Sequence, residues 1–140
     1  MNKKLLLEII PFTIFLIFGL LTLFKVKIPY GAVLTMISGA FLAMIYFYGS
    51  FWLFASGSLP APIRILAGLV YSVNFVACIY ALFHWPYWKL FSIVSYAGLG
   101  VILIVCLFNY RSLDYKPLFY RCILFLAVLS IIFGCRFYSL

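Results

Sequence analysis

Charged side chains are scarce in this sequence, and acidic ones are almost absent. The 140 residues include 10 Lys and Arg but only 2 Asp and Glu, so that charged residues make up 9% of the chain. A soluble domain carries roughly 25% charged residues, because a small globule has a large surface to cover with polar groups. Here 69% of the residues are hydrophobic. The composition therefore excludes an ordinary soluble domain and predicts that lipid covers the outer surface.

Clusters of chemically reactive side chains are missing as well. The sequence holds one histidine, His84, and two acids, Glu8 and Asp114, and its four cysteines form no C-x-x-C pair. A metal or haem centre needs several convergent ligands, and a membrane enzyme needs a nucleophile, a base or a metal site. We therefore predict no catalytic residue, no metal site and no cofactor, and we interpret the cysteines as apolar side chains.

The net charge of +8 could indicate nucleic acid as a partner. The cations, however, stand at the ends of hydrophobic runs instead of forming one patch, which is typical of residues that flank membrane spans. We expect anionic lipid headgroups as their counter-charge. The predicted partners are membrane lipids, with other membrane proteins or further copies of this chain, and no nucleic acid.

Long apolar runs predict an all-α fold, a polytopic transmembrane helix bundle. Twenty helical residues at about 1.5 Å each cross a hydrocarbon layer of about 30 Å. The runs do not alternate with period two, which excludes a β-barrel, and short connections make consecutive helices antiparallel. A four-span alternative, with one run re-entrant or lying in the interface, stays open. We predict a single integral membrane domain over 1–140, with helices at 5–24, 30–54, 63–83, 90–108 and 118–135.

The cations also favour one orientation. With five spans and a cytoplasmic N-terminus, Lys and Arg are more frequent inside than outside, as the positive-inside rule requires. The first run carries Glu8 and Pro11 and ends without a small-x-small motif, so we expect a retained helix and not a cleaved signal peptide. The predicted location is the plasma membrane, such as the inner membrane of a bacterium, with the N-terminus in the cytoplasm.

Two of the predicted connections share a pattern. Pro29 and Pro86 are each followed by Tyr and then by an apolar run, and Ser38 and Ser95 each lie nine residues beyond their proline. A repeated pattern of this kind is typical of duplicated helical units. The sequence therefore predicts two similar hairpins plus one further helix, with Pro29 and Pro86 as hinge positions.

The hinges also carry a family resemblance. Lys27 precedes Pro29 and His84 precedes Pro86 by two residues, and this Lys/His-x-Pro hinge resembles the membrane hairpin of the gliding-motility and type IX secretion motor subunit of Bacteroidetes. The hinge of that family reads roughly His-x-Pro-Gly. The resemblance implies a similar hairpin. The family drives rotation with a glutamate in its second helix, and Leu42 falls near that place here, so the motor function does not carry over.

Three further polar positions lie in or near the predicted spans, where polar groups are costly and mark candidate sites. Glu8 is expected to be a flanking surface acid that Lys3 or Lys4 neutralises. His84 is expected at the interface, bonded to a nearby carbonyl. Asn74, near the middle of the third run, is expected to bond across a helix interface inside the bundle; a contact to a substrate or to another protein is the alternative.

Two patterns concern loops and packing. Asp114 is expected to form a salt bridge in the loop that also carries Arg111 and Lys116. Small residues four apart predict faces where helices approach closely. These pairs are Gly39 with Ala43, Gly68 with Ser72, and Ser130 with Gly134.

Three functions are compatible with these patterns. The first is a small multi-pass membrane protein that acts as a non-catalytic subunit or scaffold of a membrane complex. The second is a passive transporter or channel-like protein for a small or lipidic solute, and the predicted pair of hairpins favours it. The third is an enzyme linked to lipid or quinone. Since a membrane enzyme needs reactive groups that this sequence does not cluster, we favour the first function and predict no enzymatic activity.

Overall fold

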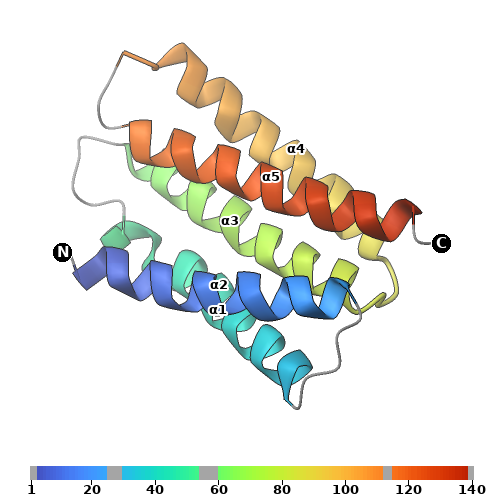
Figure 1. Ribbon diagram of the computed structural model, residues 1–140. Coiled ribbons are helices and arrows are strands. Elements are labelled where there is room, and N and C mark those ends of the chain that lie inside the picture. The colour runs from blue at the N-terminus through green and yellow to red at the C-terminus, as the bar shows by residue number, and fades with distance from the viewer. Residues whose placement is uncertain (1–2, 25–29, 54–59, 112–114, 139–140) are drawn as a thin grey trace.

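The computed structural model describes residues 3–24, 30–53, 60–111 and 115–138. The fold is an all-helical bundle (Figure 1), which confirms the predicted fold class. Within these ranges the five helices are α1 (Lys3–Leu23), α2 (Gly31–Leu53), α3 (Ala61–Leu82), α4 (Trp88–Phe108) and α5 (Lys116–Tyr138).

Each of these helices is long and apolar enough to cross a bilayer. Their candidate spans in the described part of the chain are 18 to 22 residues long, which at 1.5 Å per residue rises about 27–33 Å, the thickness of the hydrocarbon layer. Large apolar side chains lie exposed on the outer faces, including those of Ile37, Met44, Ile93, Ile104 and Ile123. Lipid is the medium in which such a surface is stable, so the protein is a helical membrane protein.

The starts of three helices are set by proline or by a left-handed residue. Pro60 precedes α3 in an extended conformation, and Pro62 follows in the first turn, where its missing N–H removes no helical bond. Tyr30 and Tyr87 directly precede α2 and α4 with φ of 64° and 67°, a conformation uncommon outside glycine. Their carbonyl oxygens accept the N–H groups of residues 34 and 91 at 2.9 and 3.1 Å. Tyr30 and Tyr87 therefore start their helices in the same way, and the predicted pair of similar hairpins stays a prediction.

Helix α3 is the centre of the bundle. Burial covers 61% of its candidate span, compared with 28% for the spans of α1 and α4. In Figure 1, α3 lies between the pair α1 and α2 and the pair α4 and α5. Helix α3 contacts every other helix, and it contributes more side chains to the core than any of them.

Aromatic rings fill the core where α1, α2, α3 and α5 meet. Phe75 of α3 packs edge-to-face on Phe15 of α1 at 5.6 Å and on Phe125 of α5 at 5.1 Å, and it stacks on Tyr46 of α2 at 5.8 Å. Such ring pairs add stability beyond the area that they bury. About two turns before Tyr46 on α2, Gly39 lets α2 approach α1 and α3: a Cβ there would lie 2.8 Å from a carbon of Ile79 and 2.9 Å from one of Phe15. The predicted close approach at Gly39 is confirmed as internal packing.

Candidate functional site

The bundle buries an ion pair that joins its first described helix to its last. Glu8 of α1 is 6% exposed, and Arg121 of α5 donates to both oxygens of its carboxylate. Nε to Oε1 is 3.0 Å, and Nη2 to Oε2 is 2.5 Å. Planar, bidentate pairing of this kind is the strongest geometry for an arginine and a carboxylate. Because helices α1, α3 and α5 run in the same direction, the pair lies near the membrane surface from which all three begin.

Two tyrosines complete the surroundings of the pair. The Tyr46 hydroxyl of α2 donates to Glu8 Oε1 at 2.7 Å, so that one carboxylate oxygen accepts bonds from two helices. The third guanidinium nitrogen, Nη1 of Arg121, donates to the carbonyl of Pro117 at 3.3 Å. Tyr71 of α3 donates its hydroxyl to the carbonyl of Leu118 at 2.8 Å. The Glu8 carboxylate, the Arg121 guanidinium and the two tyrosine hydroxyls thus all form bonds that hold α1, α2, α3 and α5 together.

This geometry corrects the expectation for Glu8. The sequence predicts that Glu8 is a surface acid neutralised by Lys3 or Lys4. In the structure Glu8 is buried and its partner is Arg121, while Lys3 is exposed. Burial explains the choice, because an unpaired charge in an apolar medium is very costly and the arginine reaches it from inside the bundle. In the part of the chain that the structure describes, no three His, Cys, Asp or Glu side chains group as metal ligands.

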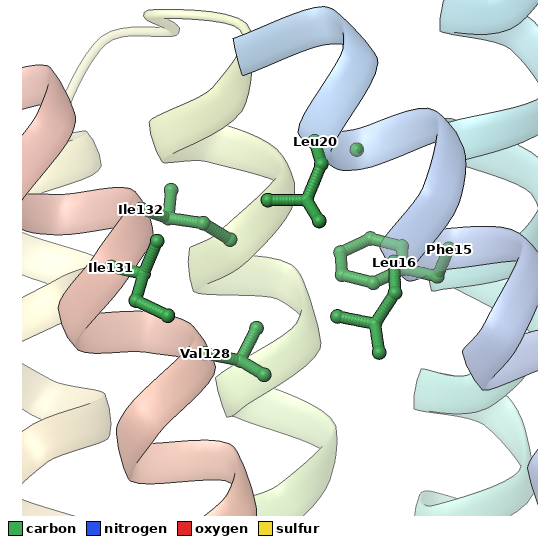
Figure 2. Close-up of a pocket in the computed structure, with 7 residues that line it drawn as sticks. Phe15, Leu16, Leu20, Val128, Ile131 and Ile132 are labelled. Atoms are coloured by element: carbon green, nitrogen blue, oxygen red, sulfur yellow. The ribbon is translucent and has the colours of Figure 1, made fainter. Parts of the chain in front are cut away.

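An apolar groove opens between α1 and α5 beyond the ion pair. Its cavity volume is about 80 Å³, and Figure 2 shows side chains of the two helices facing one another across it. The lining residues are Phe15, Leu16, Gly19, Leu20, Val128, Ile131 and Ile132. Phe12 and Phe125, whose rings lie 5.9 Å apart, join the two helices between the groove and the ion pair. The groove is therefore closed on the side of the charges and offers only carbon to an occupant.

A second polar contact lies between α3 and α4. The fully buried Asn74 accepts a bond from the Ser95 hydroxyl at 3.4 Å, between its Oδ1 and Oγ. The Asn74 amide nitrogen and the hydroxyl of Ser92, which is also fully buried, have no hydrogen-bond partner among the described residues. An unpaired polar group in an apolar interior costs about 1–3 kcal/mol. Asn74 thus contacts another helix of its own bundle, and part of its bonding capacity is unused.

The predicted hinge and interface positions lie at the other end of the bundle. His84 and Pro86 are exposed in the connection from α3 to α4, and the His84 ring lies 5.7 Å from Trp88 at 79°. His84 also has a positive φ of 53°. Pro29, the matching position of the first hairpin, lies outside the described residues, as does Asp114 with its predicted loop salt bridge. The functional roles assigned to these positions stay predictions.

Some of the predicted small-residue positions and cysteines are buried in the bundle, and others lie on its surface. Gly39 is crowded, as described, whereas a Cβ added at Gly134 of α5 or at Gly100 of α4 would meet nothing within 4 Å. Ser130, one turn before Gly134, is exposed and accepts the Tyr96 hydroxyl at 2.9 Å. Three of the free cysteines are buried and one, Cys135, is exposed. The open side of α5 is therefore the small-residue face available to another molecule.

Comparison with known proteins adds no relative. No protein-family model matches this chain, and neither the curated proteins nor the solved structures contain a match. The resemblance of the hairpins to the motor subunit stays a prediction, and the assignment of function depends on the geometry described above.

Sequence reasoning missed the ion pair and the groove for different reasons. Glu8 and Arg121 each lie five residues after the first residue of their helix, Lys3 and Lys116. In an antiparallel bundle, odd-numbered helices begin on one side of the membrane, so equal depth was a usable signal for this pair. The groove gave no such signal, because all of its lining residues are ordinary lipid-compatible side chains.

Proposed function

We propose that this protein is a non-catalytic subunit or scaffold of a membrane complex. The observation that carries the proposal is the use of Glu8, Arg121 and Tyr46 as a closed network. Ion-coupled transport and acid–base chemistry need a carboxylate that can release its partner. Here the buried acid ties helices together, so the chemistry of the bundle serves its own assembly and its outer surface remains for interaction.

The open side of α5 is the surface that we assign to a protein partner. Gly134 offers space for a close approach, and the exposed Ser130 hydroxyl, which accepts the Tyr96 hydroxyl, can donate its own hydrogen to a partner; small and hydroxyl-bearing residues are what membrane helix interfaces use. Gly39, in contrast, is already occupied by Ile79 and Phe15. The same kind of residue thus serves internal packing on α2 and external packing on α5.

Crosslinking and mild-detergent purification test this function. The chain purified from its native membrane should bring down a partner in fixed stoichiometry. Gly134→Leu should remove that partner while the thermal stability is unchanged, because among the described residues the new Cβ meets no other helix or side chain within 4 Å. Gly100→Leu is the matched control on α4, where the Cβ is equally free, and it should keep the partner. A purified chain without any stoichiometric partner would contradict the proposal.

A passive facilitator is the second candidate, and one observation favours it. Tyr30 and Tyr87 begin the second helix of each predicted hairpin in the same conformation, and paired repeats are common in transporters, whose substrate sites lie near the midplane. Asn74 and Ser92 supply buried polar groups with bonding capacity to spare. Asn74→Leu in liposomes should then abolish solute uptake while the protein stays folded. Equal uptake by both proteins would exclude this candidate.

A further inference from the structure

The groove between α1 and α5 has no occupant among the described side chains. We propose that it binds one acyl chain of a membrane phospholipid, taken from the leaflet next to the carboxyl ends of α1 and α5. Four observations carry this inference. They are the depth of the groove in the membrane, its closed inner end, its size and its purely apolar lining.

Depth is the first observation. The candidate spans cover Leu6–Leu23 on α1 and Lys116–Cys135 on α5. The groove uses residues 15 to 20 of the first and 128 to 132 of the second, so it lies entirely in the second half of both. It therefore occupies a single leaflet, and the five-residue step along α1 rises about 7.5 Å. An acyl chain also runs from one surface to the midplane, whereas a transmembrane helix of a partner would need a groove through both leaflets.

The inner end of the groove is closed near the midplane. Phe12 and Phe125 bring α1 and α5 together there at a ring distance of 5.9 Å, and Phe15, which is 1% exposed, forms the wall next to them. Beyond these rings the helices are held by Glu8 and Arg121. A chain that enters from the open end therefore stops at the midplane, where the methyl end of an acyl chain lies.

The volume of the groove fits a lipid chain and is too small for a helix of another protein. A cavity of about 80 Å³ is smaller than the roughly 150 Å³ engineered cavity that binds benzene, so it takes a short stretch of hydrocarbon. A helix with its side chains is about 10–12 Å wide and cannot enter. Such a narrow space without polar atoms also stays dry. The fitting occupant in a bilayer is thus the inner part of one hydrocarbon chain.

The lining makes a second prediction about specificity. Leu16, Leu20 and Val128 present branched carbon groups to the chain, while a Cβ at Gly19 would point away from α5, toward Leu82 and Thr35. None of these residues can recognise a phosphate or an amine. Binding should therefore depend on the acyl chain and be independent of the headgroup.

Lipid titration followed by native mass spectrometry tests the proposal. The full-length chain is delipidated in detergent and titrated with phosphatidylglycerol and with phosphatidylcholine, each with the same 18-carbon chains, and then with six-carbon versions. We expect one tightly held lipid per chain, equal affinity for the two headgroups, and at least about ten-fold weaker binding of the short lipids. That factor corresponds to the loss of roughly two buried methylene groups.

Filling the groove supplies the matched variants. Val128→Phe and Ile131→Phe place a ring in the groove and should each weaken binding of the 18-carbon lipids about ten-fold. Ile104→Phe is the control, because Ile104 of α4 is 54% exposed, like Ile131 at 53%, but does not line the groove. If Val128→Phe fails to fold, Ile131→Phe and the chain-length series decide.

Three results would overturn the proposal. One is equal retention of lipid by the groove variants and the control. Another is an affinity that follows the headgroup and ignores chain length. The third is co-purification of a peptide in place of the lipid, which would make the groove a protein-binding surface.

Discussion

Glu8 and Arg121 are 113 residues apart in the sequence and form a bidentate ion pair inside the bundle. The pair links α1 to α5 directly, although α1 otherwise packs mainly on α2 and α5 on α3 and α4. Together with the Phe12–Phe125 contact, it holds the two helices at one end of the groove. The pair thus joins the first and the last described helix on the side of the membrane where α1 begins.

Removing one member of the pair should cost more than removing both. Glu8→Leu leaves a guanidinium that is 21% exposed and cannot lose its proton, and it should destabilise the protein by up to about 3–5 kcal/mol, the cost of breaking a buried pair. Arg121→Met should cost less, because an isolated carboxyl can neutralise itself by taking up a proton. The double variant should recover most of the stability. Thermal unfolding in detergent measures this order. A double variant as unstable as the sum of the two single variants would contradict it.

Tyr46→Phe is the matched control for this network. It removes only the hydroxyl that donates to Glu8 and leaves the stacked and edge-to-face ring contacts. The expected loss is about 0.5–1.5 kcal/mol, the net value of one hydrogen bond. A loss as large as that of Glu8→Leu would mean that the hydroxyl, and not the charge pair, dominates the network.

The sequence predicted the bounds of the helices better than the side of each helix that faces the interior of the bundle. Bilayer thickness fixes the length of an apolar run, so α4 ends at Phe108 as predicted from the last apolar residue before Asn109. A helix that is apolar all round gives no amphipathic stripe to show which side turns inward. Nearness in sequence therefore favours Lys3 or Lys4 as the partner of Glu8, whereas the sequence does not show which way the α5 side chain of Arg121 faces. The groove also depends on which sides of α1 and α5 face each other, and this is not evident from apolar sequences.

Gly39 and Gly100 should respond oppositely to the same substitution. Gly39→Leu drives a side chain into Ile79 and Phe15, which lie 2.8 and 2.9 Å from its Cβ, and overpacking of this kind costs about 1–3 kcal/mol. A Cβ at Gly100 meets no other described part of the bundle within 4 Å, so Gly100→Leu should be neutral or stabilising by up to about 1 kcal/mol from helix propensity. Unfolding temperatures in one detergent compare the two. Equal destabilisation would show that the α2 approach is looser than described.

Tyr30 and Tyr87 should behave as equivalent positions. Both have positive φ and both are exposed, so Val at either site should destabilise the protein by about 1–2 kcal/mol, because a β-branched residue does not accept this conformation. Asn should be tolerated at both. Tyr110→Val is the control, since Tyr110 is exposed and is not among the positive-φ residues described. A penalty at one tyrosine alone would speak against the paired hairpins.

Cys135 provides a reporter for orientation that needs no fusion protein. It is exposed, while Cys78, Cys106 and Cys122 are buried and should not react. With the N-terminus in the cytoplasm, an impermeant maleimide should label intact cells at Cys135, and Cys135→Ser should abolish the labelling. In that Ser background, Tyr87→Cys should be labelled from outside and Tyr110→Cys only after permeabilisation, because their connections lie on opposite sides of the bundle. The reverse pattern at both positions would place the N-terminus outside, since α1 and α5 begin on the same side of the membrane and all the reporters are fixed to one bundle.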